Sequence, residues 1–278
     1  MNLYINRIVI EKEGRFSESH EFSRGLSVVK FSSDLYDAVA FLSGKSKFHF
    51  VPYGLRFFAE VEIEKTYCIC AEKKENTAHW EVTVFSRDNM ELCAEEYFEM
   101  VSAHKELDSL KFYKYSKKQN YSHRFQMYKN ILDYYPRGEF AKRTEGVGTT
   151  RSFQGFICQY IKGFKPIRLR ENKDIFIKLR TSGVFVPGYI DSEEKVFLSE
   201  SEETVFNYLC FLSLADFWRR CERIRNINCI DTPLVICDLV ERIDESYDLS
   251  PILKRTDQID RQSILFVPKN YKKTEFDL

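Results

Sequence analysis

The stretch Pro233-Leu234-Val235-Ile236-Cys237-Asp238 (PLVICD) decides the fold class of this chain. Its continuous apolar run is too short for a helix and is typical of a strand buried on both faces of a sheet. A second such run, Ser263-Ile264-Leu265-Phe266-Val267 (SILFV), follows a polar segment that is predicted to be helical over residues 252–261. Because a strand, a helix and a strand in succession pair as parallel neighbours, these residues predict an α/β core.

The part of the chain before residue 95 is predicted to be rich in strands. Half-buried strands alternate apolar and polar residues, and this pattern occurs at residues 3–11, 57–69 and 80–85. A shorter β-rich run, residues 26–31 (LSVVKF), follows the turn signal Arg24-Gly25, and residues 35–42 predict a short helix that ends near Gly44. The alternating runs are expected to be antiparallel strands of one sheet with a buried face.

Composition indicates a packed, neutral globule. Lys plus Arg (42) equals Asp plus Glu (42), so the bulk charge gives no reason to expect a strongly basic nucleic-acid binder. Residues 1–13 carry charges and lack the apolar core of a signal peptide, and no run of about 18 apolar residues could span a bilayer. We therefore expect a cytoplasmic protein with no membrane partner.

The eight cysteines give no sign of a metal site. Cys68 and Cys70 are the only close pair, and neither a CxxC pair nor a Cys/His cluster has the spacing of zinc ligands. Reduced, mostly buried thiols are expected.

Residues 198–203 (LSESEE) mark the start of a helix. Ser199 is placed as an N-cap, with Glu202 three residues later as in a capping box. A strongly apolar helical run follows, whose expected core positions are Phe206, Leu209, Leu212, Leu214 and Trp218.

Taken in order, these features resemble the ATP-binding-cassette heads of the RecF and SMC proteins. The resemblance extends along the whole chain and is most specific from Leu198 to Val267, where the signature-like LSESE precedes the Pro-led strand, an Ile-Asp pair at residues 243–244 and RQSILFV. It implies an α/β head with a mixed β-sheet, parallel core strands and flanking helices. No long coiled coil is expected, because sustained heptads are absent between about residues 95 and 135.

The resemblance also divides the single head of residues 1–278 into three parts. We expect an N-terminal strand-rich lobe at residues 1–95, a helical and basic insertion at 96–165, and a C-terminal lobe with signature-like and Walker B-like elements at 166–278.

Such heads hold phosphates with a glycine-rich loop after an early strand. The matching connection here, Lys30–Asp37 (KFSSDLYD), contains no glycine and is about five residues too short. Phe31 and Tyr36 would lie where the backbone must approach the phosphates, and Asp34 and Asp37 would repel them.

The resemblance places the Mg²⁺ chemistry after the Pro-led strand. Counting back from Asp244 puts Cys237 at the metal position and Asp238 at the catalytic, Walker B-like position. A register shifted by one makes Asp238 the metal acid and puts Leu239 where the base should be. Either alignment lacks one essential carboxylate, and a thiol is a poor ligand for a hard cation. No cofactor and no metal ligand is therefore expected, and ATP with Mg²⁺ enters only if the chain is an active ATPase.

The elements that act across a dimer interface in such heads match this sequence better than the phosphate loop and the Mg²⁺ position do. Ser199 and Glu202 match nucleotide-binding signature positions, and Leu198, Ser199, Glu241 and Asp244 are the expected interface residues. A Ser-capped helix and a polar turn explain the same residues equally well.

Three functions follow as hypotheses. The first is an inactive head that assembles with itself or with another subunit in a DNA-directed repair or antiviral defence complex. The second is an active ATPase with an unorthodox phosphate loop. The third is a stand-alone nucleic-acid-binding module that uses basic residues interleaved with aromatics, namely Lys111, Lys114, Lys117, Lys118 and Arg124. A helical arm with solvated lysines would give the same basic pattern.

Overall fold

The computed structural model of the chain describes residues 2–44, 54–74, 80–86, 91–92, 112–114, 169–170, 175–179, 185–189, 194–224, 230–244 and 247–271. The chain divides into two compact units. The first unit comprises residues 1–114, 214–241 and 248–278, and the second comprises residues 115–213 and 242–247. The predicted insertion at residues 96–165 lies almost wholly outside the described residues, so the three-part division stays a prediction.

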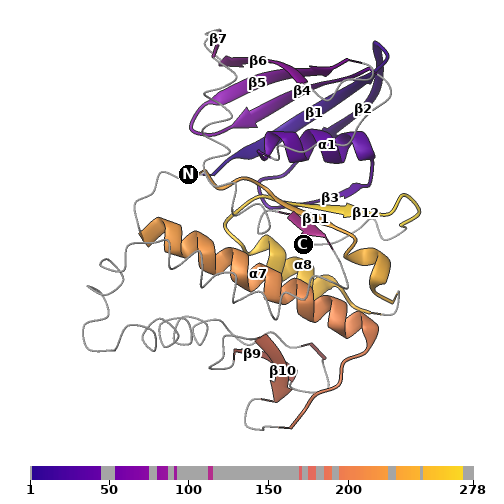
Figure 1. Cartoon of the computed structure of the whole chain (residues 1–278), viewed down its shortest axis with the longest axis vertical. Coiled ribbons are helices and arrows are strands. Elements are labelled where there is room, and N and C mark those ends of the chain that lie inside the picture. Colours follow the sequence, from indigo (N-terminus) through magenta and orange to yellow (C-terminus); the bar gives the residue numbers. More distant parts are fainter. Residues whose placement is uncertain are drawn as a thin grey trace. The chain divides into compact units, whose positions relative to one another are not determined.

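The first unit contains a six-stranded antiparallel sheet (Figure 1). Its order is β2-β1-β4-β5-β6-β7, with β1 at Tyr4–Lys12, β2 at Arg15–Glu21, β4 at Leu55–Glu62, β5 at Thr66–Lys73, β6 at Trp80–Ser86 and β7 at Glu91–Leu92. Alternate residues of β4 are buried, as the alternation in the sequence predicts. The run at 57–69 is nevertheless two strands, because Glu64 takes a left-handed conformation and the chain reverses there.

A second sheet in the same unit is parallel throughout and has the order β3-β12-β11-β8. Its strands are β3 (Leu26–Lys30), β8 (Phe112–Lys114), β11 (Leu234–Cys237) and β12 (Ser263–Val267). Helix α8 (Ser250–Asp257) connects β11 to β12, which confirms the predicted strand, helix and strand. The helix ends before residue 261 because Arg261 and Gln262 are buried in contacts with other segments. Residues 112–114, predicted within a helical insertion, form β8 because they pair with β11.

Helix α1 (Ser33–Leu42) lies between the two sheets (Figure 1). The apolar core contains residues of α1, of the antiparallel sheet and of β11 and β12. The buried side chain of Gln262 adds a polar link, since it accepts from the Ile5 amide at 2.8 Å and donates to the carbonyls of Ile5 (2.8 Å) and Ser23 (2.7 Å). These contacts hold β1 and the residues just before β3 against the segment that joins α8 to β12. The fold is therefore the mixed α/β arrangement that the sequence predicts.

The second unit contains the hairpin of β9 (Ile175–Leu179) and β10 (Phe185–Tyr189), together with the first half of the long helix α7 (Glu200–Ile224). The predicted core positions Phe206, Leu209 and Leu212 are buried. The side chains of Leu214 and Trp218 lie outside those described. Within the described ranges, no helix has the length and apolarity required to cross a membrane.

Candidate functional site

The carboxyl ends of β3, β12 and β11 form one edge of the parallel sheet, because parallel strands all end on the same side. Open α/β sheets bind their ligands at this edge. The segment Lys30–Asp37 begins at the end of β3, and Asp238 follows β11. The fold therefore brings the candidate phosphate link and the Walker B-like acid to the same edge, with β12 between them.

The connection between β3 and α1 consists of two residues, Phe31 and Ser32. The Phe31 amide donates to the carbonyl of Val267 on β12 at 2.7 Å, which continues the sheet pairing. Ser32 is the N-cap of α1, and its hydroxyl accepts from the Leu35 amide at 3.5 Å. The sheet thus passes directly into the helix with no loop of the length that wraps a phosphate.

Carboxylates already lie at the N-terminal end of α1. The hydroxyl of Ser32 donates to Glu18 Oε1 at 2.6 Å, and the other oxygen of Glu18 lies 3.0 Å from His20 Nε2. Asp34 lies in the first turn, is almost fully buried and forms an ion pair with Lys12 of β1. A helix N-terminus attracts anions, and here the chain's own acids occupy that role.

Aromatic rings cover the same edge. The ring centroids of Phe31, Tyr36 and Phe266 lie 5.7 to 6.1 Å apart, with Phe266 edge-on to the other two. The sequence places Phe31 and Tyr36 where a phosphate loop would approach its ligand, and the structure packs them against β12. Their packing leaves bulky side chains where a glycine-rich loop leaves open backbone.

Asp37 has a different role from the expected one. It is buried (5% exposed), and its carboxylate attracts the ammonium group of Lys73, an inward-facing residue of β5 that is 1% exposed. Lys73 Nζ also lies 5.8 Å from the ring centroid of Trp80. The charge of Asp37 is directed into the core, where it helps to hold α1 on the antiparallel sheet, and its expected repulsion of phosphate stays a prediction.

Asp238 is placed by an unusual backbone conformation. Its φ of 58° is left-handed, a region that Asp enters more readily than most residues. The neighbours Cys237 and Leu239 are buried, and Cys237 belongs to the apolar core. Within the described part of the chain, no three His, Cys, Asp or Glu residues are grouped so as to hold a metal ion. The Walker B-like role of Asp238 stays a prediction.

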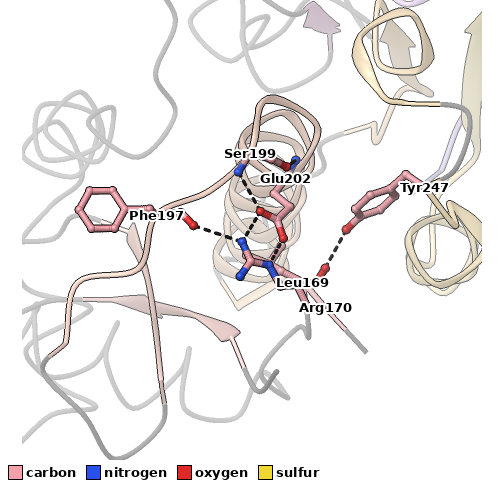
Figure 2. A network of polar contacts seen from close by, with 6 residues as sticks. All are labelled: Leu169, Arg170, Phe197, Ser199, Glu202 and Tyr247. Carbon is pink, nitrogen blue, oxygen red and sulfur yellow. Dashed lines mark hydrogen bonds and ion pairs between the residues drawn. The ribbon is translucent and has the colours of Figure 1, made fainter. Parts of the chain in front are cut away.

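The second candidate region is the N-terminal end of α7, which Figure 2 shows from close by. Ser199 and Glu202 form the expected capping box. The Ser199 amide donates to Glu202 Oε2 at 2.8 Å, and the Glu202 amide donates to Ser199 Oγ at 3.3 Å. Both signature-like side chains therefore hold the start of the helix, which satisfies amides that an approaching anion would otherwise meet.

Arg170 completes this cap, and sequence reasoning missed it. Its guanidinium binds both oxygens of Glu202 through Nε and Nη2, and Nη2 also donates to the Phe197 carbonyl at 3.2 Å (Figure 2). Such a two-point contact between a guanidinium and a carboxylate is strong and directional. No local spacing could have revealed it, since the two residues are 32 positions apart.

The segment around Asp244 joins the same cluster. The Asp244 amide donates to Ser201 Oγ at 3.0 Å. The nearby Tyr247 hydroxyl donates to the Leu169 carbonyl at 2.8 Å, as Figure 2 shows. The structure thus brings the predicted interface residues Leu198, Ser199 and Asp244 into one region. Glu241 is exposed but belongs to the first unit, and the interface role of all four residues stays a prediction.

This cluster presents an exposed surface that we call the α7 cap surface, comprising residues 197–203 and 244. Phe197 is 76% exposed, and Lys195 Nζ lies 5.2 Å from the centroid of its ring. Exposed acids surround it at Glu200, Glu203 and Asp244. A large exposed ring on a braced, polar scaffold is suited to contact with another protein.

The candidate nucleic-acid residues are scarcely described. Lys114 ends β8, where it pairs with Cys237. Lys111, Lys117, Lys118 and Arg124 lie outside the described residues, so their role stays a prediction.

Comparison with known proteins finds a likeness among solved structures. No family model matches the chain, and no curated protein matches it significantly. Among solved structures, the chain is similar to the recombination mediator protein RecF of the RecFOR pathway, in a form described as RecF-ATPrS. The match covers 98% of this chain and 94% of that chain, with a TM-score of 0.39 and 13% sequence identity. At these values the likeness assigns no role to any residue of the site.

Proposed function

We propose that this protein is a non-hydrolysing, head-like subunit that works by assembling with another protein. The observation that carries the proposal is the closed N-terminal end of α1. Ser32, Glu18 and Asp34 occupy the place where a phosphate-binding helix presents free amides.

The charges at the start of α1 disfavour the approach of a phosphate. A phosphate approaching α1 meets the carboxylates of Glu18 and Asp34, and Asp34 lies in a buried site where like charges repel more strongly than in water. Lys12 is paired with Asp34, so it does not supply the positive charge that a phosphate-loop lysine provides. Nucleotide binding at this edge is therefore unfavourable.

The set of carboxylates that ATP hydrolysis would need after β11 is also incomplete. Asp238 is the single acid between the buried Cys237 and Leu239, whereas metal-assisted phosphoryl transfer needs groups both to hold the cation and to position the attacking water. We expect no ATP turnover from one carboxylate at this position.

The assembly role rests on the α7 cap surface. Arg170 and the capping box hold the start of α7, and the bond between Asp244 and Ser201 holds the neighbouring segment against it. A rigid surface loses little conformational freedom on binding, and an exposed aromatic ring is a common anchor of protein interfaces. The DNA-directed repair or defence setting of this assembly rests on the sequence resemblance.

The hydrolysis half of the proposal is tested with purified protein and Asp238→Asn. We expect no turnover above a mock purification. Turnover that persists unchanged in Asp238→Asn comes from a contaminating enzyme, whereas turnover that this substitution abolishes would refute the non-hydrolysing assignment.

The assembly half is tested by light scattering on the wild type and on Phe197→Glu, alone and with proteins co-purified from the native source. Phe16→Glu is the matched control, because Phe16 is also exposed (68%) but lies on β2. We expect an oligomer or heteromer that Phe197→Glu disrupts and Phe16→Glu leaves intact. A wild-type protein that stays monomeric with every candidate partner contradicts the assembly role.

A further inference from the structure

The antiparallel sheet has an outward face that carries a pocket of ≈ 370 Å³. The strands β1, β4, β5 and β6 line it, with Phe58 and Phe85 as its large apolar side chains. Phe57 is buried in the core while its neighbour Phe58 is 36% exposed, so the pocket lies on the side of the sheet away from α1. None of these residues takes part in the proposed assembly surface.

Two free thiols lie side by side in this pocket. Cys68 is exposed, Cys70 is partly exposed, and the residue between them, Ile69, points into the core. Because successive side chains of a strand point to opposite faces, both thiols share the outward face of β5. Register places Cys70 beside Phe58 of β4 and Cys68 beside Phe85 of β6.

The geometry disfavours a disulfide between them. Two residues along a strand advance about 6.7 Å, and their Cβ atoms point the same way, so the Cβ atoms stay at a similar separation. A disulfide needs a Cβ separation of about 3.8 Å. Closing that gap would shorten a strand that is paired to β4 on one side and β6 on the other.

An atom held between the two sulfurs fits without moving the strand. Two metal–sulfur bonds of about 2.3 Å each span about 4.6 Å, a separation that rotation of the two side chains can reach. The spacing therefore suits a bridging ligand better than a direct sulfur–sulfur bond.

A positive charge accompanies the thiols. The guanidinium of Arg56 lies 4.7 Å from the ring centroid of Phe58. The side chain of Arg56 also hydrogen-bonds Cys70. Metals bind the thiolate form of cysteine, so a guanidinium beside the pair would offset the negative charge of the bound ligands.

We propose that Cys68 and Cys70 form a two-sulfur site for a soft monovalent metal ion, Cu(I). Soft thiolates select this ion, whereas structural zinc requires four ligands. In the described segments no third His, Cys, Asp or Glu joins the pair in a ligand group. A bis-thiolate Cu(I) complex carries one net negative charge, which the guanidinium of Arg56 would balance.

The test uses the full reduced chain under anaerobic conditions, with Cu(I) supplied from a bathocuproine disulfonate complex. Alkylation by iodoacetamide is then mapped by peptide mass spectrometry. We expect Cu(I) to abolish alkylation at both Cys68 and Cys70. Equal alkylation with and without Cu(I), or protection of one thiol alone, would overturn the site.

Variants separate this pair from the other cysteines. Cys68→Ser with Cys70→Ser is expected to lose one bound Cu(I), whereas Cys210→Ala, at a buried position on α7, is expected to keep it. Circular dichroism melting confirms that each variant is folded. A double variant that keeps the wild-type copper stoichiometry contradicts the proposal, and so does protection of both thiols by Zn(II) but not by Cu(I).

Discussion

Gly25 illustrates how a single residue position can be dictated by a contact that is distant in sequence. The turn signal Arg24-Gly25 predicts a turn before β3, but not why glycine is needed there. In the structure, Asp257 Oδ1 at the end of α8 accepts from the Leu26 amide at 2.9 Å. A Cβ atom on Gly25 would lie 2.3 Å from that oxygen. A side chain at this position would therefore require the Asp257 carboxylate to move.

At this scale we predict that Gly25→Ala lowers the free energy of unfolding by about 1–3 kcal/mol, because the methyl group displaces the Asp257 carboxylate and breaks its bond to Leu26. Gly54→Ala is the matched control, since no atom lies within 4 Å of a Cβ there. Denaturant unfolding of both variants measures the difference. Equal stabilities would show that the Asp257 contact contributes nothing.

Helix α1 shows why the local pattern predicted an element but not its electrostatic role. Its limits were predictable from the apolar run and Gly44, which takes a left-handed φ of 85° just past the helix end. The contact between Asp37 and Lys73 was not predictable, because Lys73 lies on β5, which only the tertiary fold brings near α1. The capping box of α7 was predictable, since Ser199 and Glu202 are three residues apart, whereas its Arg170 contact was not.

We predict that Asp37→Asn lowers the free energy of unfolding by about 3 kcal/mol, because it removes the carboxylate that attracts the buried Lys73 ammonium. Asp37→Asn combined with Lys73→Met should recover most of the loss. Chemical denaturation of the single and double variants measures both. A double variant no more stable than the single one would contradict the pairing.

The burial of Lys73 beside α1 makes the stability of the fold depend on pH. Burial lowers the pKa of Lys73 below its ordinary value of 10.5, so the unfolded chain binds more protons in the window between the two values. Stability therefore rises with pH in that window. The rise should be present in the wild type and absent from the double variant, and it should begin at lower pH in Asp37→Asn, since the attraction of Asp37 opposes the shift.

For the whole molecule, the sequence predicted the α/β class and the parallel pairing of β11 with β12, because both follow from local apolar runs and a general crossover rule. It could not predict how the antiparallel sheet is joined to this core. That junction depends on Gln262 reaching Ile5 across 257 positions and on a shared core around α1. The closed N-terminal end of α1 was likewise unpredictable from the sequence, because it depends on tertiary contacts with Glu18 of β2 and Lys12 of β1.

We expect this closed end of α1 to exclude a nucleotide, and direct binding of Mg-ATP, measured by isothermal titration calorimetry, tests this. We expect no saturable heat, with any Kd weaker than about 1 mM, corresponding to about −4 kcal/mol. Saturable, magnesium-dependent binding in the micromolar range that Asp238→Asn weakens would contradict the account, because it would require a phosphate site at the sheet edge that Ser32, Glu18 and Asp34 now fill.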